Sequence, residues 1–185
     1  FFETNNSDSI TVVFTSSLDS THRLARLLQL LWSNRQRTSG GSGPSEVAEF
    51  SSSLSQVERS QLMTKCRQSQ DVKVVVCSDG MSRGMDLPHV ALVVNYDVPS
   101  FAKTYVHRCG RTARAGKVGR AISLLKKGQV VQFHRMRSLI EEPRRVQTTS
   151  VSRELVRDSF AHYKACVKQL RVVMRAEAEE NLGPT

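Results

Sequence analysis

The chain has 185 residues, a length that suits one domain with a hydrophobic core and an appendage. It contains 27 lysine and arginine residues against 17 aspartate and glutamate residues, and the resulting formal net charge of +10 favours a polyanionic partner such as nucleic acid. A hydrophobic content of 39% argues against disorder of the whole chain. No stretch is apolar for long enough to span a bilayer and no signal-peptide pattern opens the sequence, so we expect no membrane partner.

Short apolar runs alternate with helical patterns over most of the chain. Strands are predicted at residues 10–14, 47–50, 73–77, 91–95 and 119–125. Helices are predicted from Ser17 onwards and at residues 55–67, 100–112 and 128–140. Continuous apolar strands that alternate with helices predict an α/β fold, with a parallel sheet covered by helices on both faces and all carboxyl ends at one edge.

Two segments depart from this alternation. Residues 34–45 contain three glycines and a proline, which predicts a flexible loop. Beyond residue 147, apolar residues recur at alternating steps of four and three, which predicts a long C-terminal helix with a heptad seam. The seam consists of Val156, Phe160, Tyr163, Val167, Leu170 and Met174. Each of five basic residues follows a seam residue by one: Arg157, Lys164, Lys168, Arg171 and Arg175. We favour a helix docked on its own domain over one that binds a protein partner or RNA.

The predicted organisation is a tail or linker over residues 1–9, an α/β domain over residues 10–142 and a helical extension over residues 148–180. The four cysteines form no C-x-x-C pair, and no histidine lies at metal-ligand spacing from them. We therefore predict reduced thiols in a cytosolic or nuclear protein and no metal site in this chain.

Two segments concentrate groups that bind phosphates. The stretch H-R-C-G-R-T-A-R-A-G begins at His107, and on a helix His107, Arg111 and Arg114 would share a face. Two guanidinium groups aimed together suit a phosphate whose charge is growing, although a solvated basic face is the alternative. The stretch S-D-G-M-S-R-G-M-D-L-P begins at Ser78, directly after a predicted buried strand. Open parallel sheets bind their ligands at that edge.

Together these stretches resemble the fifth and sixth motifs of DEAD-box RNA helicases. V-V-F-T-S-S, ending at Ser17, resembles motif IV of the family, and Q-V-E-R, from Gln56 to Arg59, resembles its Q-x-x-R element. Four signatures in the family's order span residues 10–140 and imply a RecA-like domain. The resemblance implies the second of two such domains, because no Walker A lysine or D-E-A-D stretch is visible. Gly110 to Lys117 has the wrong spacing for a phosphate-binding loop.

In the resembled family, ATP lies between the two domains and the N-terminal domain holds Mg²⁺. The resemblance implies that Arg111 and Arg114 are arginine fingers that reach the γ-phosphate when the domains close. It implies nucleotide contacts for Gly84 and Asp86, the latter as acceptor for the ribose hydroxyls. The alternatives are surface arginines and a turn aspartate before Pro88.

The resemblance also assigns RNA-backbone contacts and contacts between the two domains. RNA contacts are implied for Ser17, Gln56, Arg59, Ser78 and Gly80. Interdomain coupling is implied for Arg83, His107 and Gly110, and the resemblance also places His107 with Arg111 and Arg114 among the catalytic residues. A local hydrogen bond is the alternative for His107, and an exposed helix arginine is the alternative for Arg59.

Other residues of these motifs carry structural expectations. We expect Asp79 to be a structural acceptor that holds its loop, and Arg108 to pack in the domain or at its interface. Ala113 replaces the family's usual glycine, which is tolerable unless the backbone there needs a positive φ.

The sequence thus predicts the second half of an ATP-dependent RNA helicase that unwinds short duplexes, inactive without its N-terminal domain. V-V-N-Y-D-V-P, from Val93 to Pro99, resembles the branch that acts in large ribosomal subunit assembly. That resemblance implies ribosomal RNA and a nucleolar location, with the cytoplasm as the alternative. A translocase half from another branch of the superfamily and a non-enzymatic basic RNA-binding domain are the rival functions.

Overall fold

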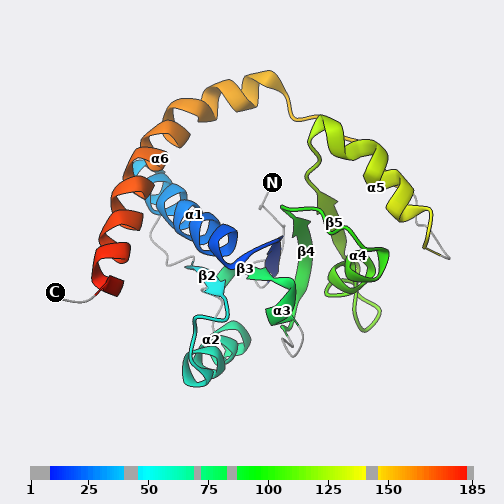
Figure 1. The fold of residues 1–185 in the computed structure, drawn as a ribbon, viewed down its shortest axis with the longest axis horizontal. Helices are drawn as coiled ribbons and strands as arrows, with labels where there is room; N and C mark the ends of the chain where they lie inside the picture. The colour runs from blue at the N-terminus through cyan, green and yellow to red at the C-terminus, as the bar shows by residue number, and fades with distance from the viewer. Residues whose placement is uncertain (1–8, 40–45, 69–71, 83–86, 141–145, 183–185) are drawn as a thin grey trace. The chain divides into compact units, whose positions relative to one another are not determined.

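The computed structural model describes residues 9–39, 46–68, 72–82, 87–140 and 146–182 (Figure 1). The chain divides into two compact units. The first unit comprises residues 1–22 and 43–143 and contains the sheet. The second comprises residues 23–42 and 144–185 and contains two long helical segments.

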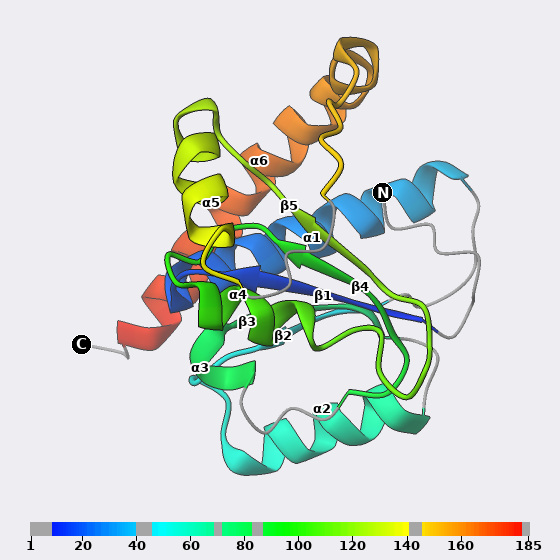
Figure 2. The ribbon, with the colours of Figure 1, turned by 90° about the vertical axis from the view of Figure 1, so that its right-hand side faces the viewer.

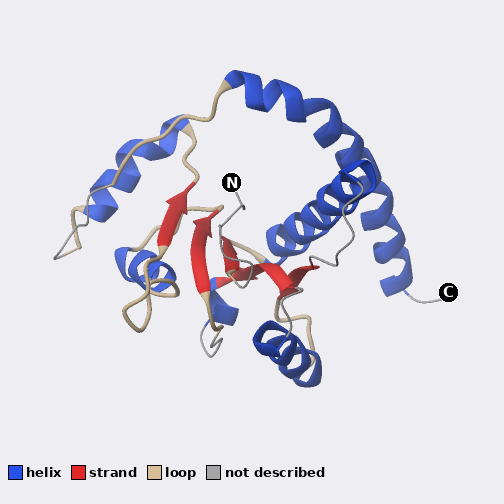
Figure 3. Ribbon diagram, turned by 180° about the vertical axis from the view of Figure 1, so that it is seen from behind, coloured by secondary structure: helices blue, strands red, loops and turns tan. Residues whose placement is uncertain are grey.

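The first unit is built on one parallel five-stranded sheet, as predicted from the sequence. Its strands are β1 (Ile10–Thr15), β2 (Glu46–Phe50), β3 (Val72–Ser78), β4 (Val90–Asn95) and β5 (Arg120–Ser123). They lie in the order β2-β3-β1-β4-β5, and every neighbouring pair is parallel (Figure 3). The register pairs Thr15 with Ser78 and Phe14 with Asn95, so the carboxyl ends of β1, β3 and β4 lie next to one another.

Helices flank this sheet. They are α1 (Leu18–Ser39), α2 (Gln56–Gln68), α3 (Asp79–Ser82), α4 (Ala102–Cys109), a 3₁₀ turn η1 (Lys127–Gln129) and α5 (Val130–Arg137). Figures 1 and 2 show α2, α3 and α4 on one face of the sheet and the first turn of α1 on the other. Helix α5 packs against α4 through the rings of Tyr105 and Phe133, whose centroids lie 5.5 Å apart. Helix α4 ends at Cys109, although the sequence predicted a helix as far as residue 112.

The core of the first unit lies between the sheet and α2. It contains fully buried residues of the central strands, including Val12, Phe14 and Val75, together with Cys66 of α2. Burial raises the pKa of the Cys77 thiol to about 12, so this thiol stays protonated at neutral pH and packs as an apolar group. All four cysteines are free thiols, as predicted.

The second unit joins the rest of α1 to α6 (Arg153–Leu182). The Asn34 side-chain amide donates hydrogen bonds to Cys166 Sγ at 3.3 Å and to Gln169 Oε1 at 3.1 Å. The prediction of a loop from residue 34 was therefore wrong as far as Ser39, because α1 continues there with Asn34 bonded to α6. The remainder of that predicted loop, residues 40–45, lies outside the described residues.

The long C-terminal helix is confirmed, but its contact line differs from the predicted seam. Cys166, which is fully buried, lies on the contact side although it was not assigned to the seam. The seam residues Val167, Leu170 and Met174 are half-buried. The first three, Val156, Phe160 and Tyr163, are exposed to 53%, 51% and 45%. The C-terminal part of the predicted seam therefore packs against α1 of the same chain, whereas its first three residues are exposed.

No described helix is both long and apolar enough to cross a membrane.

Candidate functional site

The turn from β1 into α1 presents two serines at the carboxyl edge of the sheet. The Ser17 hydroxyl accepts a hydrogen bond from the backbone N–H of Ser20 at 3.1 Å, which makes Ser17 the N-cap of α1. The backbone N–H and the hydroxyl of Ser16 donate to the Asp97 carboxylate, which follows β4, at 2.9 and 3.0 Å. Ser17 is exposed, so the residue predicted to contact RNA is accessible, and its hydroxyl also caps the helix.

Helix α2 begins with a capping box that fixes the Q-x-x-R segment. The Glu58 carboxylate accepts from the Ser55 backbone N–H at 2.7 Å, and the Ser55 hydroxyl accepts from the Glu58 N–H at 3.3 Å. Hydrogen bonds from Ser55 hold the pKa of Glu58 below its ordinary value of 4.5. Gln56 is exposed, and Arg59 Nη2 donates to the Ser52 carbonyl at 3.1 Å. The capping box thus orients both predicted RNA contacts.

The end of β3 and the start of α3 carry three of the residues that the sequence singled out and that the structure describes. Ser78 and Asp79 are half-buried, and Gly80 is exposed with no atom within 4 Å of the place a Cβ would occupy. The predicted site residues Arg83, Gly84 and Asp86 lie outside the described residues. The register places Ser78 beside Thr15, and therefore near the turn that carries Ser17.

Arg108 is the centre of a buried polar network. Its side chain is 1% exposed and forms a bidentate ion pair with Asp79, with both N···O distances at 2.6 Å. Its Nη1 atom also donates to the Asp97 carbonyl at 2.6 Å and to Asn95 Oδ1 at 3.3 Å. The guanidinium carbon lies 5.0 Å from the centroid of the Phe14 ring. Asp79 is therefore a structural acceptor and Arg108 a packing residue, as predicted.

The structure also brings together the three residues proposed as catalytic, although not on one helical face. Since α4 ends at Cys109, Arg111 and Arg114 lie on the loop that follows, and the predicted shared helix face is corrected. Arg111 Nη2 still contacts His107 Nε2, and Arg114 Nε donates to the Gly110 carbonyl at 2.9 Å.

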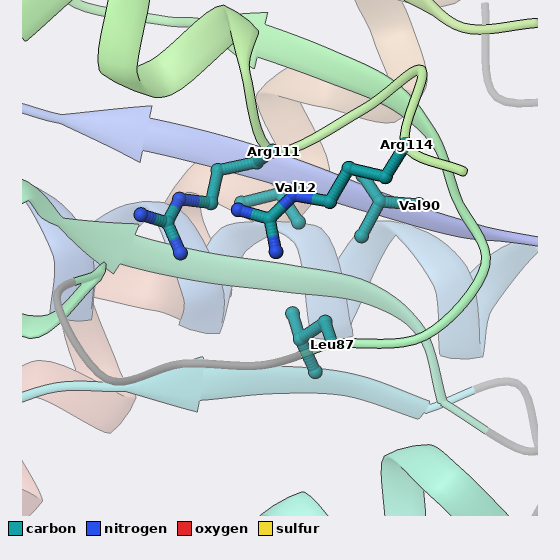
Figure 4. Close-up of a pocket in the computed structure, with 5 residues that line it drawn as sticks. All are labelled: Val12, Leu87, Val90, Arg111 and Arg114. Atoms are coloured by element: carbon teal, nitrogen blue, oxygen red, sulfur yellow. The ribbon is translucent and has the colours of Figure 1, made fainter. Parts of the chain in front are cut away.

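A shallow pocket is lined by Arg111 and Arg114 together with Val12, Leu87 and Val90. Figure 4 shows the two arginine side chains side by side, both extending in the direction in which β1 runs. Their guanidinium groups are therefore directed along the strands towards the carboxyl edge of the sheet. Leu87 is the residue after Asp86 in the sequence.

The loop that carries the two arginines has an unusual backbone. Ala113 and Ala115 have φ angles of 56° and 52°, in the left-handed region that favours glycine. The sequence analysis predicted that alanine at position 113 is unfavourable if the backbone needs a positive φ, and the backbone there has one. The Thr112 hydroxyl anchors the loop by donating to the Val90 carbonyl at 2.6 Å. A Cβ on Gly119 would lie 2.1 Å from Thr112 Oγ1, so only glycine fits there.

The sequence predicted which polar and charged residues lie at this edge, but it did not predict the hydrogen bonds that connect them. Asn95, which is fully buried, accepts from Arg108 and donates to Ser123 Oγ of β5 at 3.1 Å. Its position at the end of an apolar strand was the only signal of this role. Among the described residues, no group of three histidine, cysteine, aspartate or glutamate side chains could hold a metal ion.

Comparison with known proteins identifies the family. The model of the helicase conserved C-terminal domain matches residues 2–116. This chain belongs to that family. Its relatives include the DEAD-box ATP-dependent RNA helicase 1 of Arabidopsis thaliana, which is 41% identical over 68% of this chain and 22% of its own length. The ATP-dependent RNA helicase DDX51 of Homo sapiens is 35% identical over 90% of this chain and 23% of its own length.

Another relative is the ATP-dependent rRNA helicase RRP3 of Coccidioides immitis, 40% identical over 70% of this chain and 24% of its own length. The chain thus spans about a quarter of the length of such relatives. Domain 2 of the Mss116p DEAD-box helicase, solved bound to an RNA duplex, superposes with a TM-score of 0.64 at 24% identity, over 90% of this chain and 69% of that one. The Escherichia coli DEAD-box protein SrmB, solved with a regulator of ribonuclease activity, gives 0.57 at 30% identity, over 78% and 82%. The predicted resemblance to DEAD-box C-terminal RecA-like domains is confirmed.

Proposed function

We propose that this domain is the second half of an ATP-dependent DEAD-box RNA helicase and supplies both arginine fingers and RNA-backbone contacts. The observation that carries the proposal is the parallel arrangement of Arg111 and Arg114 along one sheet face, directed towards the carboxyl edge (Figure 4). Parallel α/β sheets bind their ligands at that edge. Two adjacent permanent cations directed towards that edge suit the terminal phosphates of a nucleotide held by a second domain.

The two arginines act when the N-terminal RecA-like domain brings ATP against this surface. As the bond to the leaving phosphate breaks, negative charge develops on the phosphoryl oxygens, and a guanidinium aimed at it lowers the barrier. Gly84 and Asp86 contact the nucleotide, and Mg²⁺ is held by the N-terminal domain. His107 contacts Arg111, which suits a role in coupling the nucleotide state to the position of a finger. Arg83 and Gly110 complete the interdomain contact.

RNA lies along the carboxyl edge of the sheet in this proposal. Ser17, just after β1, and Ser78, the last residue of the adjacent strand β3, offer hydroxyl groups, and Gly80 allows a close approach to the backbone of its exposed turn. Arg59, beside Gln56, supplies a cation for a phosphate. Contacts of this kind position RNA without reading its sequence. They suit local melting of a short duplex irrespective of its bases.

The proposed substrate is ribosomal RNA, and the proposed location is the nucleolus, with the cytoplasm as the alternative. The support is the V-V-N-Y-D-V-P segment together with relatives whose names include an rRNA helicase. A protein partner at the 156–174 segment of α6 is a further candidate, which the exposure of Val156, Phe160 and Tyr163 permits.

The finger assignment is tested by Arg111→Ala in the full-length helicase. RNA-stimulated ATP hydrolysis is expected to fall by about a thousandfold or more, because a finger contributes that much to phosphoryl transfer. RNA affinity and the circular dichroism spectrum are expected to stay close to those of the wild type. A steady-state phosphate-release assay measures the rate.

Arg135→Ala is the matched control, since Arg135 is an exposed arginine on α5. It removes the same charge without removing a finger and is expected to retain hydrolysis. Normal turnover by Arg111→Ala would refute the finger role. If ATP also failed to bring the two domains together, the alternative of a non-enzymatic RNA-binding domain would replace this proposal.

A further inference from the structure

We propose that the exposed basic face of α6 is a second binding site for single-stranded RNA, separate from the Ser17, Arg59 and Ser78 contacts. The proposal rests on the proposed function in one respect, namely that RNA is the polyanion this protein meets. The face, called here the α6 basic stripe, consists of Arg153, Arg157, Lys164, Lys168, Arg171 and Arg175.

The stripe is continuous because of the helical repeat. At 3.6 residues per turn, its six positions fall within a sector of about 60° around the helix axis. They extend over 22 residue steps, about 33 Å at 1.5 Å per residue. All six side chains are exposed. The two acidic residues in this part of α6, Glu154 and Asp158, fall outside the sector, and Asp158 forms an exposed ion pair with Arg157 at 3.9 Å. The other five basic residues form a row of positive charge that faces solvent.

An aromatic ring borders the N-terminal part of the stripe. Phe160 is 51% exposed, and the Lys164 ammonium lies 5.5 Å from the centroid of its ring. Phosphates need fixed cations, whereas unpaired bases need flat apolar surfaces on which to stack. The combination of the two along one helix matches a single strand better than a duplex, whose bases are already stacked.

The contacts within the second unit disfavour a membrane as the ligand. An amphipathic helix that lies in a membrane inserts a wide apolar face. In α6 the side around Cys166 is fully buried, and Asn34 of α1 bonds to Cys166 and Gln169 there. Arg26 of α1 pairs with Glu177 at 2.7 Å, near the other end of the same contact. Between Cys166 and Glu177 the apolar side of α6 is therefore covered by α1, which leaves the helix without the long apolar face that insertion needs.

The experiment measures binding of the 185-residue chain to a fluorescein-labelled 20-nucleotide oligouridylate by anisotropy, without nucleotide, between 50 and 250 mM KCl. The test variant is Lys164→Gln/Lys168→Gln/Arg171→Gln. We expect at least tenfold weaker binding at 100 mM KCl. The slope of log K against log salt is expected to become shallower by about 2, because each lost phosphate contact contributes about 0.7 for single strands.

The control variant is Lys126→Gln/Lys127→Gln/Arg135→Gln, which removes three exposed positive charges from the first unit. It is expected to leave the salt slope within about 0.5 of the wild type. Phe160→Ala is expected to weaken binding about fivefold or more while leaving the slope unchanged, because it removes stacking and no charge. Circular dichroism confirms that each variant retains its helix content.

An equal loss of RNA affinity in the test variant and the control variant would overturn the proposal, because RNA binding would then depend on net charge alone. The proposal would also be overturned if the test variant kept its RNA affinity but lost binding to another polyanion. The two polyanions to compare are phosphatidylserine vesicles, and polyglutamate as a substitute for an acidic protein partner. Since no nucleotide is present, these results do not depend on Arg111. A failed finger assignment and a failed stripe assignment are therefore distinguishable.

Discussion

Arg108 shows how much a single side chain organises at the carboxyl edge of this sheet. Its guanidinium holds the Asp79 carboxylate, the Asp97 carbonyl and the Asn95 amide oxygen, which follow or end β3 and β4, the two strands on either side of β1. A cation that is 1% exposed is stable only when its donors are satisfied in this way. The sequence could place Arg108 in the domain core or interface, but not choose Asp79 as its partner, since the two are 29 residues apart.

Ala113 offers a test at the same scale. Ala113→Gly is expected to raise the free energy of unfolding by about 0.5–1 kcal/mol, because glycine relieves the steric cost of the left-handed φ and that gain exceeds the entropy glycine adds to the unfolded chain. Urea denaturation followed by circular dichroism measures the difference.

The control is Ala161→Gly, another exposed alanine, which lies inside α6. Glycine there is expected to lower stability by about 1 kcal/mol. If Ala113→Gly were destabilising to the same degree, the left-handed conformation at Ala113 would be wrong.

At the level of elements, the loop that carries Arg111 and Arg114 is constrained by the close approach of the chain before β5. A Cβ on Gly119 would lie 2.1 Å from Thr112 Oγ1 and 2.5 Å from the Ala113 nitrogen. Gly119→Ala is therefore expected to displace the loop and to lower the RNA-stimulated ATPase rate of the full-length helicase by about tenfold or more, since small misplacements of catalytic groups are costly.

Gly128→Ala is the matched substitution, because no atom lies within 4 Å of the Cβ it would add. The same phosphate-release assay is expected to give a wild-type rate for this variant. Wild-type activity in Gly119→Ala would mean that the loop tolerates the displacement, and that Thr112 does not fix the fingers.

The elements also show what sequence patterns can and cannot predict. Apolar runs such as Val74 to Cys77 specified buried parallel strands, because both faces of such strands must be apolar. The extent of α1 was missed because its last turns include Asn34, whose partners Cys166 and Gln169 lie more than 130 residues away. The α6 seam was misplaced for a similar reason, since periodicity alone does not say which side a neighbour covers.

At the scale of the whole molecule, the proposed function makes the candidate site one half of a nucleotide site, the other half belonging to a second domain. The sequence predicted which polar and charged residues belong to the site, because motif residues at the ends of apolar strands reach one edge in any parallel sheet. Their joint geometry was not foreseen, since α4 was expected to continue to residue 112 and instead ends at Cys109.

The isolated chain is therefore expected to bind RNA but to hydrolyse ATP no faster than a buffer blank. Adding the N-terminal domain of the same helicase in trans should produce RNA-stimulated hydrolysis, because the nucleotide and the two arginines then meet. A coupled assay with and without RNA measures both states. Robust hydrolysis by the 185-residue chain alone would show that it holds a complete catalytic centre, contrary to the proposal.

The Arg108 network has one consequence for how the helicase would sense its ligands. Arg108 of α4 binds Asp79, the residue after Ser78, so the end of β3 and the helix that leads into Arg111 cannot shift independently of each other. Under the proposed function, RNA binding at Ser78 and ATP hydrolysis at Arg111 would then be coupled within this domain by the Arg108–Asp79 ion pair.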